Sequence, residues 1–138
     1  MEIIRAPLLE WNASLPAIRI SVERLTLAKR RWRGVAEDGC DFGFDLNAPL
    51  ADGACVFQTE SACYFIAQKY ETVLELRTGT EAARVGWMIG NLHFQIEITD
   101  DAIRVADDPA LRQLFDREHI PFVGCKRVFH PLSGAHRH

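Results

Sequence analysis

No uninterrupted apolar stretch in the sequence approaches the length of about 18 residues that a membrane-spanning helix needs. The first residues, Met1-Glu2-Ile3-Ile4-Arg5, also lack the charged, apolar and small-residue regions of a secretory signal. Apolar residues make up 48% of the chain and charged residues 25%, which is typical of a folded globular protein. We therefore expect a cytoplasmic protein that has no membrane partner.

Cysteine is scarce, and the four residues of this type never occur in the Cys-x-x-Cys spacing of redox and zinc sites. They are Cys40, Cys55, Cys63 and Cys125. Thiols stay reduced in the cytoplasm, so buried and inert cysteines are expected rather than a disulfide framework. Because a thiolate suits several metal ions, a ligand role for one of them stays open.

Motifs of the common enzyme classes are missing as well. The sequence contains no Gly-x-Ser-x-Gly, no phosphate-binding glycine loop and no His-Glu-x-x-His. Acidic pairs do occur, at Asp100-Asp101 and Asp107-Asp108, but they stand where a turn and a helix cap need them. We therefore predict that the protein is not an enzyme.

Positive charge is not in excess, because the formal net charge is -3. A general attraction to nucleic acid or to an anionic membrane is therefore not expected. One basic run stands out, Lys29-Arg30-Arg31-Trp32-Arg33, and basic residues on the exposed face of a strand explain it. No nucleic-acid partner is predicted.

Residues 1–70 are expected to form a small N-terminal all-β domain, because short apolar segments alternate with turn signals and no long amphipathic helix is evident. Alternating apolar residues from Phe42 to Leu46 place three apolar side chains on one face of a strand. Hairpin turns are predicted around Gly39 and Gly53, since glycine tolerates the positive φ that such turns require.

Residues 71–138 follow a different order of elements: strand, helix, strand, strand, helix, strand. This is the ferredoxin-like βαββαβ pattern, so the fold class expected for the whole chain is α+β. The first helix begins at about Thr80 and buries a stripe that includes Val85 and Ile89. Gly90 is expected to end this helix in the left-handed conformation.

The second strand of this domain is predicted over Phe94, Ile96 and Ile98, whose alternation with polar residues places all three on one buried face. The second helix is predicted to begin at Asp108-Pro109, with the aspartate as N-cap and the proline in the first turn. A last strand over residues 122–129 completes the pattern.

Five histidines are the candidates for metal chemistry, because imidazole binds several transition metals. His93 follows the first helix and shares its strand parity with Gln95, so its ring should point away from the core. His136 and His138 lie in a small, polar C-terminal segment where imidazoles are free to coordinate. His119 ends a helix, where a positive charge suits the helix dipole. On the residues alone, a plain surface residue is the commoner interpretation for His93, and a solvated tail is the alternative for His136 and His138.

Several segments within residues 25–138 together resemble the urease accessory protein UreE family of nickel metallochaperones. The most specific is Gly-Trp-Met-Ile-Gly-Asn-Leu-His at residues 86–93, which is similar to the family's Tyr-His-Leu-Gly-Asn-Arg-His motif, with Leu92 in place of the arginine. The ending is similar as well. Phe129-His130-Pro131 and Gly134-Ala135-His136 resemble the family's Phe-x-Pro-Glu-Gly-Ala-Tyr and the histidines that follow it.

The resemblance implies that His93, the last histidine of the motif, binds metal, and that two subunits hold one ion between their His93 residues. It implies a homodimer through the C-terminal domain, partners in the urease apoprotein and other urease accessory proteins, and an N-terminal domain that binds proteins. Nickel is the metal implied, although zinc or copper can bind the same imidazoles. His136 and His138 are expected to add to the coordination.

A second interpretation stays open, in which the chain is a protein-interaction module and its histidines bind no metal. The sequence also leaves open which metal is bound in the cell, whether His130 or a cysteine takes part, and which surface docks the urease assembly complex.

Overall fold

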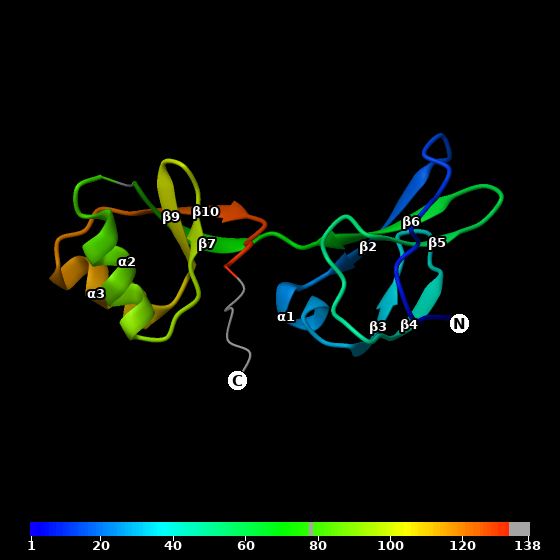
Figure 1. Ribbon diagram of the computed structural model, residues 1–138, viewed down its shortest axis with the longest axis horizontal. Coiled ribbons are helices and arrows are strands. Elements are labelled where there is room, and N and C mark those ends of the chain that lie inside the picture. Colours follow the sequence, from blue (N-terminus) through cyan, green and yellow to red (C-terminus); the bar gives the residue numbers. More distant parts are fainter. Residues whose placement is uncertain (78, 133–138) are drawn as a thin grey trace. The chain divides into compact units, whose positions relative to one another are not determined.

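The computed structural model describes residues 1–77 and 79–132, and the chain divides into two compact units, Met1–Lys69 and Tyr70–His138 (Figure 1). Each unit has its own cluster of buried apolar side chains. The helices and strands together make a mixed α+β protein, so the predicted fold class is confirmed.

The N-terminal unit consists of two three-stranded sheets and one turn of helix (Figure 1). The strand orders are β1-β4-β3 and β2-β6-β5, in which β1 runs parallel to β4 and β2 parallel to β6. The elements are β1 (Glu2–Ile4), β2 (Ala17–Val22), α1 (Arg24–Leu27), β3 (Arg31–Val35), β4 (Asp41–Asp45), β5 (Cys55–Gln58) and β6 (Cys63–Gln68). The predicted β domain is confirmed, apart from the four-residue helix α1 that the sequence pattern did not indicate.

Aromatic side chains fill the centre of this unit. Phe42, Phe44 and Leu46 are buried, as their alternation predicted. Trp32 lies opposite Phe44 in the β3–β4 register, and the two rings stack with their centroids 3.8 Å apart. The indole N–H of Trp32 is buried and has no hydrogen-bond partner among the described residues.

The two turn glycines have different roles. Gly39 has a φ of 90° and joins the antiparallel strands β3 and β4, which confirms the hairpin predicted there. Gly53 also has a positive φ, of 87°, but it lies between β4 and β5, which belong to different sheets. The second predicted hairpin is therefore wrong, because the turn carries the chain from one sheet to the other.

The C-terminal unit is a four-stranded antiparallel sheet covered on one face by two helices (Figure 1). Its strand order, β10-β7-β9-β8, is the ferredoxin-like arrangement that the order of elements predicted. The elements are β7 (Glu71–Arg77), α2 (Ala82–Asn91), β8 (Glu97–Ile98), β9 (Ala102–Ala106), α3 (Pro109–Arg117) and β10 (Val123–Arg127). The N-cap of α3 is confirmed, since the Asp108 carboxylate accepts a hydrogen bond of 2.8 Å from the Ala110 N–H.

Two details of the predicted second unit are wrong. Gly90 lies inside α2, which continues to Asn91, and the left-handed residue is His93 with a φ of 65°. Ile98 is 57% exposed, although its neighbours Phe94 and Ile96 pack against the core. Ile98 pairs with Ile103 but lies on the short strand β8 at the edge of the sheet, where the helices no longer cover it.

Candidate metal centre

His93 is held at the end of α2 by a Schellman motif. The His93 N–H donates to the Gly90 carbonyl oxygen at 2.9 Å, and the Phe94 N–H reaches the Ile89 carbonyl oxygen at 3.4 Å. These two bonds satisfy the last carbonyl groups of the helix and fix His93 in the left-handed region. Its side chain is exposed, so a rigid backbone presents the imidazole to solvent.

The conformation of His93 costs free energy, because an L-residue with a Cβ is crowded in the left-handed region. Glycine is the residue that this position of the motif usually takes. Residues held in such conformations occur preferentially at functional sites, where the surrounding structure offsets the strain. His119 has the same left-handed conformation, so the backbone alone does not distinguish His93 as a ligand.

The outer face of α2 leads directly to this histidine. Ala83, Trp87 and Gly90 follow one another at helical spacing and all three are exposed. Trp87 is 68% exposed and Leu92 is 45% exposed, whereas a Cβ built on Gly90 meets nothing within 4 Å. The ring of Trp87 thus projects from a helix face whose other exposed residues, Ala83 and Gly90, have small side chains or none.

The C-terminal segment returns to the start of the second strand, close in the chain to His93. The Leu132 N–H donates to the Ile96 carbonyl oxygen at 2.7 Å, and the His130 N–H donates to Oε1 of Glu97 at 3.1 Å. Leu132 is therefore anchored to Ile96, which is three residues beyond His93 in the chain. His136 and His138 lie outside the described residues.

Glu97 is itself held by a network on the sheet face opposite the helices. The guanidinium of Arg104 bonds Glu97 at 3.2 Å and Glu75 at 2.8 Å, and its side chain is only 12% exposed. Two carboxylates around one largely buried arginine keep each charge paired, so Glu97 is a fixed acceptor for the C-terminal segment. The sequence pattern gave no indication of this anchor.

One chain does not assemble a metal site from its described residues. No three side chains of His, Cys, Asp or Glu lie close enough together there to hold a metal ion. A metal site of three or more such ligands that includes His93 therefore needs ligands from outside the described residues or from another molecule.

The other predicted ligand candidates are separate from His93. His119 ends α3 in a Schellman motif of its own, formed by bonds from the His119 N–H to the Asp116 carbonyl oxygen and from the Ile120 N–H to the Phe115 carbonyl oxygen. All four cysteines are free thiols. The expected burial is confirmed for Cys55 and Cys63 and is wrong for Cys40, which is exposed, and for Cys125, which is half-buried. Burial raises the pKa of the Cys55 thiol, which keeps it protonated and a poor ligand.

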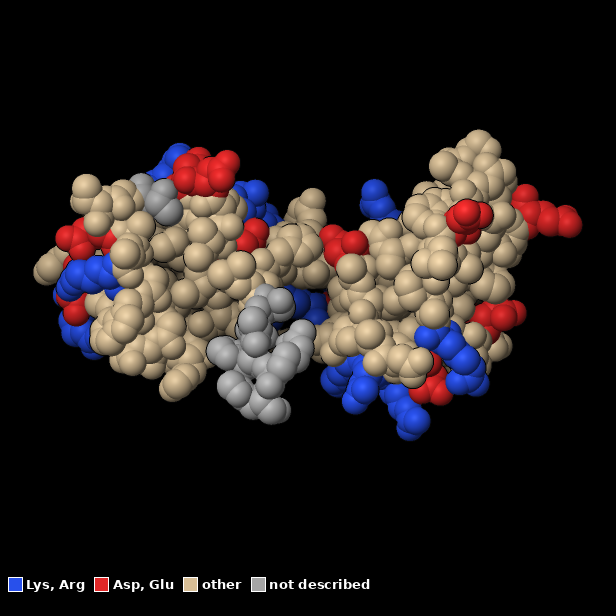
Figure 2. Space-filling view, in the orientation of Figure 1, with Lys and Arg blue, Asp and Glu red and all other residues tan. Residues whose placement is uncertain are grey.

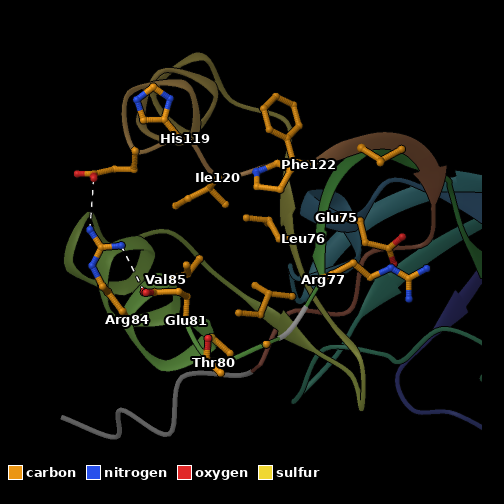
Figure 3. A pocket seen from close by; sticks show the side chains of 16 residues that line it. Glu75, Leu76, Arg77, Thr80, Glu81, Arg84, Val85, His119, Ile120 and Phe122 are labelled. Atoms are coloured by element: carbon orange, nitrogen blue, oxygen red, sulfur yellow. Dashed lines mark hydrogen bonds and ion pairs between the residues drawn. The ribbon is translucent and has the colours of Figure 1, made fainter.

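A groove of the C-terminal unit lies at the other end of α2 (Figure 3). Its volume is about 490 Å³, and it runs between the beginning of α2, the end of α3 and the end of β7. Figure 3 shows Leu76, Val85, Ile120 and Phe122 as its apolar lining, with His119 at the rim. Arg84 bridges the two helices there, since its guanidinium bonds both Glu81 at 3.5 Å and Glu118 at 3.3 Å.

None of the helices in the described part of the chain combines the length and the apolar character needed to cross a lipid bilayer. Residues 71–138 match the family described as "UreE urease accessory protein, C-terminal domain". This is the segment that contains His93, α2 and the C-terminal segment.

Curated relatives extend the similarity over nearly the whole chain. The urease accessory protein UreE of Burkholderia ambifaria is 30% identical over 140 aligned positions, which cover 95% of this chain and 68% of the relative. The UreE of Bifidobacterium longum subsp. infantis is also 30% identical, over 66% of this chain and 42% of the relative. The UreE of Prochlorococcus marinus subsp. pastoris is 25% identical over 80% of this chain and 76% of the relative. The chain therefore belongs to the family of urease accessory protein UreE.

Proposed function

We propose that the protein is a nickel metallochaperone that binds Ni(II) at His93 and delivers it to urease during assembly of the urease active site. The observation that carries the proposal is the place of His93, an exposed imidazole at the end of α2 and three residues before Ile96, to which the C-terminal segment is anchored. His119 has the same capping geometry but, among the described residues, no such anchor near it in the chain. The family name, urease accessory protein, supports urease as the partner. Nickel is the metal that the resemblance of the motif at residues 86–93 implies.

A single imidazole binds nickel too weakly to carry it, so the site needs a second subunit. In a homodimer with two-fold symmetry, the same surface of each chain meets its copy, and a residue near the axis meets itself. His93 placed at this axis contributes one imidazole from each subunit. One Ni(II) ion then lies between the two chains and also links them.

The outer face of α2 is the surface that we propose for this dimer. Trp87 is exposed in a single subunit, while Ala83 and Gly90 on either side of it leave room on the helix surface. Trp87 of each subunit fills the space above the small residues of the other helix, as a self-complementary contact requires. His93 lies at the end of the same helix, so this packing brings it to the interface.

The last six residues complete the metal coordination in this proposal. Ni(II) prefers tetragonal or octahedral surroundings, and two imidazoles leave several positions open. Leu132 is anchored beside Ile96, and a chain of four residues spans up to about 14 Å, so His136 can reach the vicinity of His93. His138 is a further ligand within the same reach.

We assign the N-terminal unit to docking of the protein partners, urease apoprotein and other urease accessory proteins, in the cytoplasm. The division of labour follows from the separate cores of the two units, because one unit can bind a partner without disturbing the other. Zinc and copper compete for the same imidazoles, so delivery to urease rather than intrinsic affinity selects nickel.

Nickel titration of the purified full chain tests the proposal, with His93→Ala compared against His119→Ala. Both substitutions remove an exposed left-handed histidine from the same capping motif, so any effect on folding is shared. Calorimetry is expected to show loss of the tightest site in His93→Ala only. Equal nickel affinity in the two variants would refute the site and favour an interaction module whose histidines bind no metal.

A further inference from the structure

The exposed edge of the N-terminal unit carries a concentration of positive charge that the metal site does not use. Four of the five residues from Lys29 to Arg33 are basic, in a chain whose net charge is -3. All four basic side chains are exposed. Figure 2 shows Lys and Arg side chains gathered on the part of this unit that contains α1 and β3.

Only part of this charge is neutralised within the described residues. Asp45 receives Nε of Arg31 at 3.1 Å and Nη1 of Arg5 at 3.0 Å, so one carboxylate serves two guanidinium groups. Neither Arg30 nor Arg33 forms an ion pair among the described residues. The strand therefore presents exposed positive charge that is available to an acidic partner.

The same strand also has an open backbone edge. β3 is the last strand of the sheet β1-β4-β3 in the described part of the chain, with β4 on one side only. At both ends of the β3–β4 pair, the even-numbered residues on the β3 side form the hydrogen bonds toward β4. The Ala36 N–H donates to the Cys40 carbonyl oxygen, and the Arg30 carbonyl oxygen accepts from the Leu46 N–H. Alternation in an antiparallel ladder then directs the backbone groups of Arg31 and Arg33 outward.

The open stretch is short and well defined. At its far end, Ala36 forms a bridge to Ile20 of β2, so the edge is free only over the residues that contain the arginines. On the outer face of β3 itself, Val35 is 59% exposed. An extended segment laid along β3 would meet backbone hydrogen-bonding groups and guanidinium groups, with one apolar side chain beside them.

From these observations we infer that the edge of β3 binds an extended acidic segment of a protein partner. The segment adds to the sheet as a further strand, in the manner of β-augmentation, with backbone bonds to Arg31 and Arg33. Its carboxylates pair with the guanidinium groups of Arg30, Arg31 and Arg33, for which planar bidentate contacts are favourable. The inference deepens the docking role proposed for the N-terminal unit by naming its surface and the chemistry of its partner.

The probe for this site is a fluorescein-labelled peptide of ten residues in which glutamate alternates with valine. We expect the full-length protein to bind it with an affinity that falls as salt rises, because ion pairs at an exposed surface are screened. In the variant Arg30→Glu/Arg33→Glu, binding should weaken at least tenfold by fluorescence anisotropy. Lys69→Glu/Arg117→Glu makes the same change in net charge outside the run and should stay within twofold of the wild type.

Two further binding measurements distinguish strand pairing through the backbone from attraction by charge alone. The same peptide N-methylated at every residue keeps its charge but cannot donate strand hydrogen bonds on either edge, so it should bind at least tenfold more weakly. A single-stranded thymidine decanucleotide should bind more weakly than the peptide. Equal loss in both double variants, equal binding of the methylated peptide, or tighter binding of the oligonucleotide would each overturn the inference. The nickel titration of the His93 variants measures a different site. If the peptide does not bind as expected, the proposed nickel site is therefore unaffected.

Discussion

His93 and His119 occupy the same position in the same capping motif, with φ values of 65° and 55° at the ends of α2 and α3. Each is the residue after the C-cap, where glycine is the usual choice, and each is exposed. The two helices of the C-terminal unit thus end on a left-handed histidine, and only His93 is close in the chain to Ile96, which accepts the hydrogen bond that anchors Leu132. One histidine is therefore a matched control for the other.

Replacing either histidine with glycine should stabilise the protein. A left-handed L-residue costs roughly 1 to 2 kcal/mol, and the extra chain entropy of glycine returns about 0.5 to 1 kcal/mol of this, so a net gain of about 0.5 to 1 kcal/mol is expected in each variant. Urea denaturation of His93→Gly and His119→Gly measures the gain. Nickel binding should be lost only in His93→Gly. A loss of stability in either variant would mean that its imidazole supports the fold.

Trp87 should contribute strongly to the dimer. Truncation of a central tryptophan in an interface typically costs at least about 2 kcal/mol, which corresponds to a roughly 30-fold weaker association. We expect Trp87→Ala to raise the dimer dissociation constant by this factor in sedimentation velocity over a dilution series. Trp11, which is 41% exposed in the N-terminal unit, is the control. A dimer weakened equally by Trp11→Ala, or unaffected by Trp87→Ala, would place the interface elsewhere.

The hydrogen bond that ties the hairpin at Gly39 to Tyr64 should stop stabilising the fold in acid. The Tyr64 hydroxyl donates to Oδ2 of Asp38 at 2.5 Å, and this bond, with a second from the Cys40 N–H, lowers the pKa of the Asp38 carboxyl below its usual range. A carboxyl whose pKa is lower in the folded state stabilises the fold above its unfolded pKa of about 3.9, and this contribution disappears as the pH falls through the folded value.

The variant Tyr64→Phe removes this contribution at every pH. Its denaturation midpoint should lie below that of the wild type at pH 7, and the gap should close as the pH falls below about 3.9. The comparison of Asp38→Asn with Asp38→Asn/Tyr64→Phe serves as the control, because the hydroxyl of Asp38→Asn has no carboxylate to stabilise and the gap between these two variants should not change with pH. A gap that is constant from pH 7 to pH 3 would mean that the tyrosine acts through packing alone.

Local periodicity was sufficient to predict the secondary structure and the ferredoxin-like order of the second unit. The Val85–Ile89 stripe, the Asp108 cap and the alternation from Phe42 to Leu46 each depend on neighbours within a few residues, and all are confirmed. Such patterns follow from the fixed repeat of a helix or strand and need no knowledge of tertiary contacts.

The errors arise where tertiary contacts decide. Gly90 was expected to end α2, but the helix continues and packs Ile89, so the left-handed residue falls on His93. Ile98 has the alternation of a buried strand, yet it lies at a sheet edge. The anchor from His130 to Glu97 joins residues that are 33 positions apart, a pairing that no local pattern contains.

The C-terminal residues 133–138 should add ligands to the nickel site but contribute little to its affinity. Leu132 is already fixed to Ile96, so only the residues beyond it must be ordered when His136 or His138 binds. Fixing each residue costs about 1 to 2 kcal/mol of conformational entropy, which offsets much of the gain from each added imidazole. A site completed in this way releases its metal easily, as a carrier requires.

Deletion of residues 133–138 is therefore expected to lower the nickel affinity at pH 7.5 modestly and to leave the His93 site in place. Because a protonated imidazole cannot bind metal, the difference between the full chain and the truncated one should fade as the pH falls below about 6.5. His136→Ala/His138→Ala in the full chain should reproduce the deletion, whereas Ser133→Ala/Arg137→Ala should not. If the truncated protein binds nickel with the same affinity and stoichiometry as the full chain at pH 7.5, the two histidines are not ligands, and the dimer must complete the coordination with water.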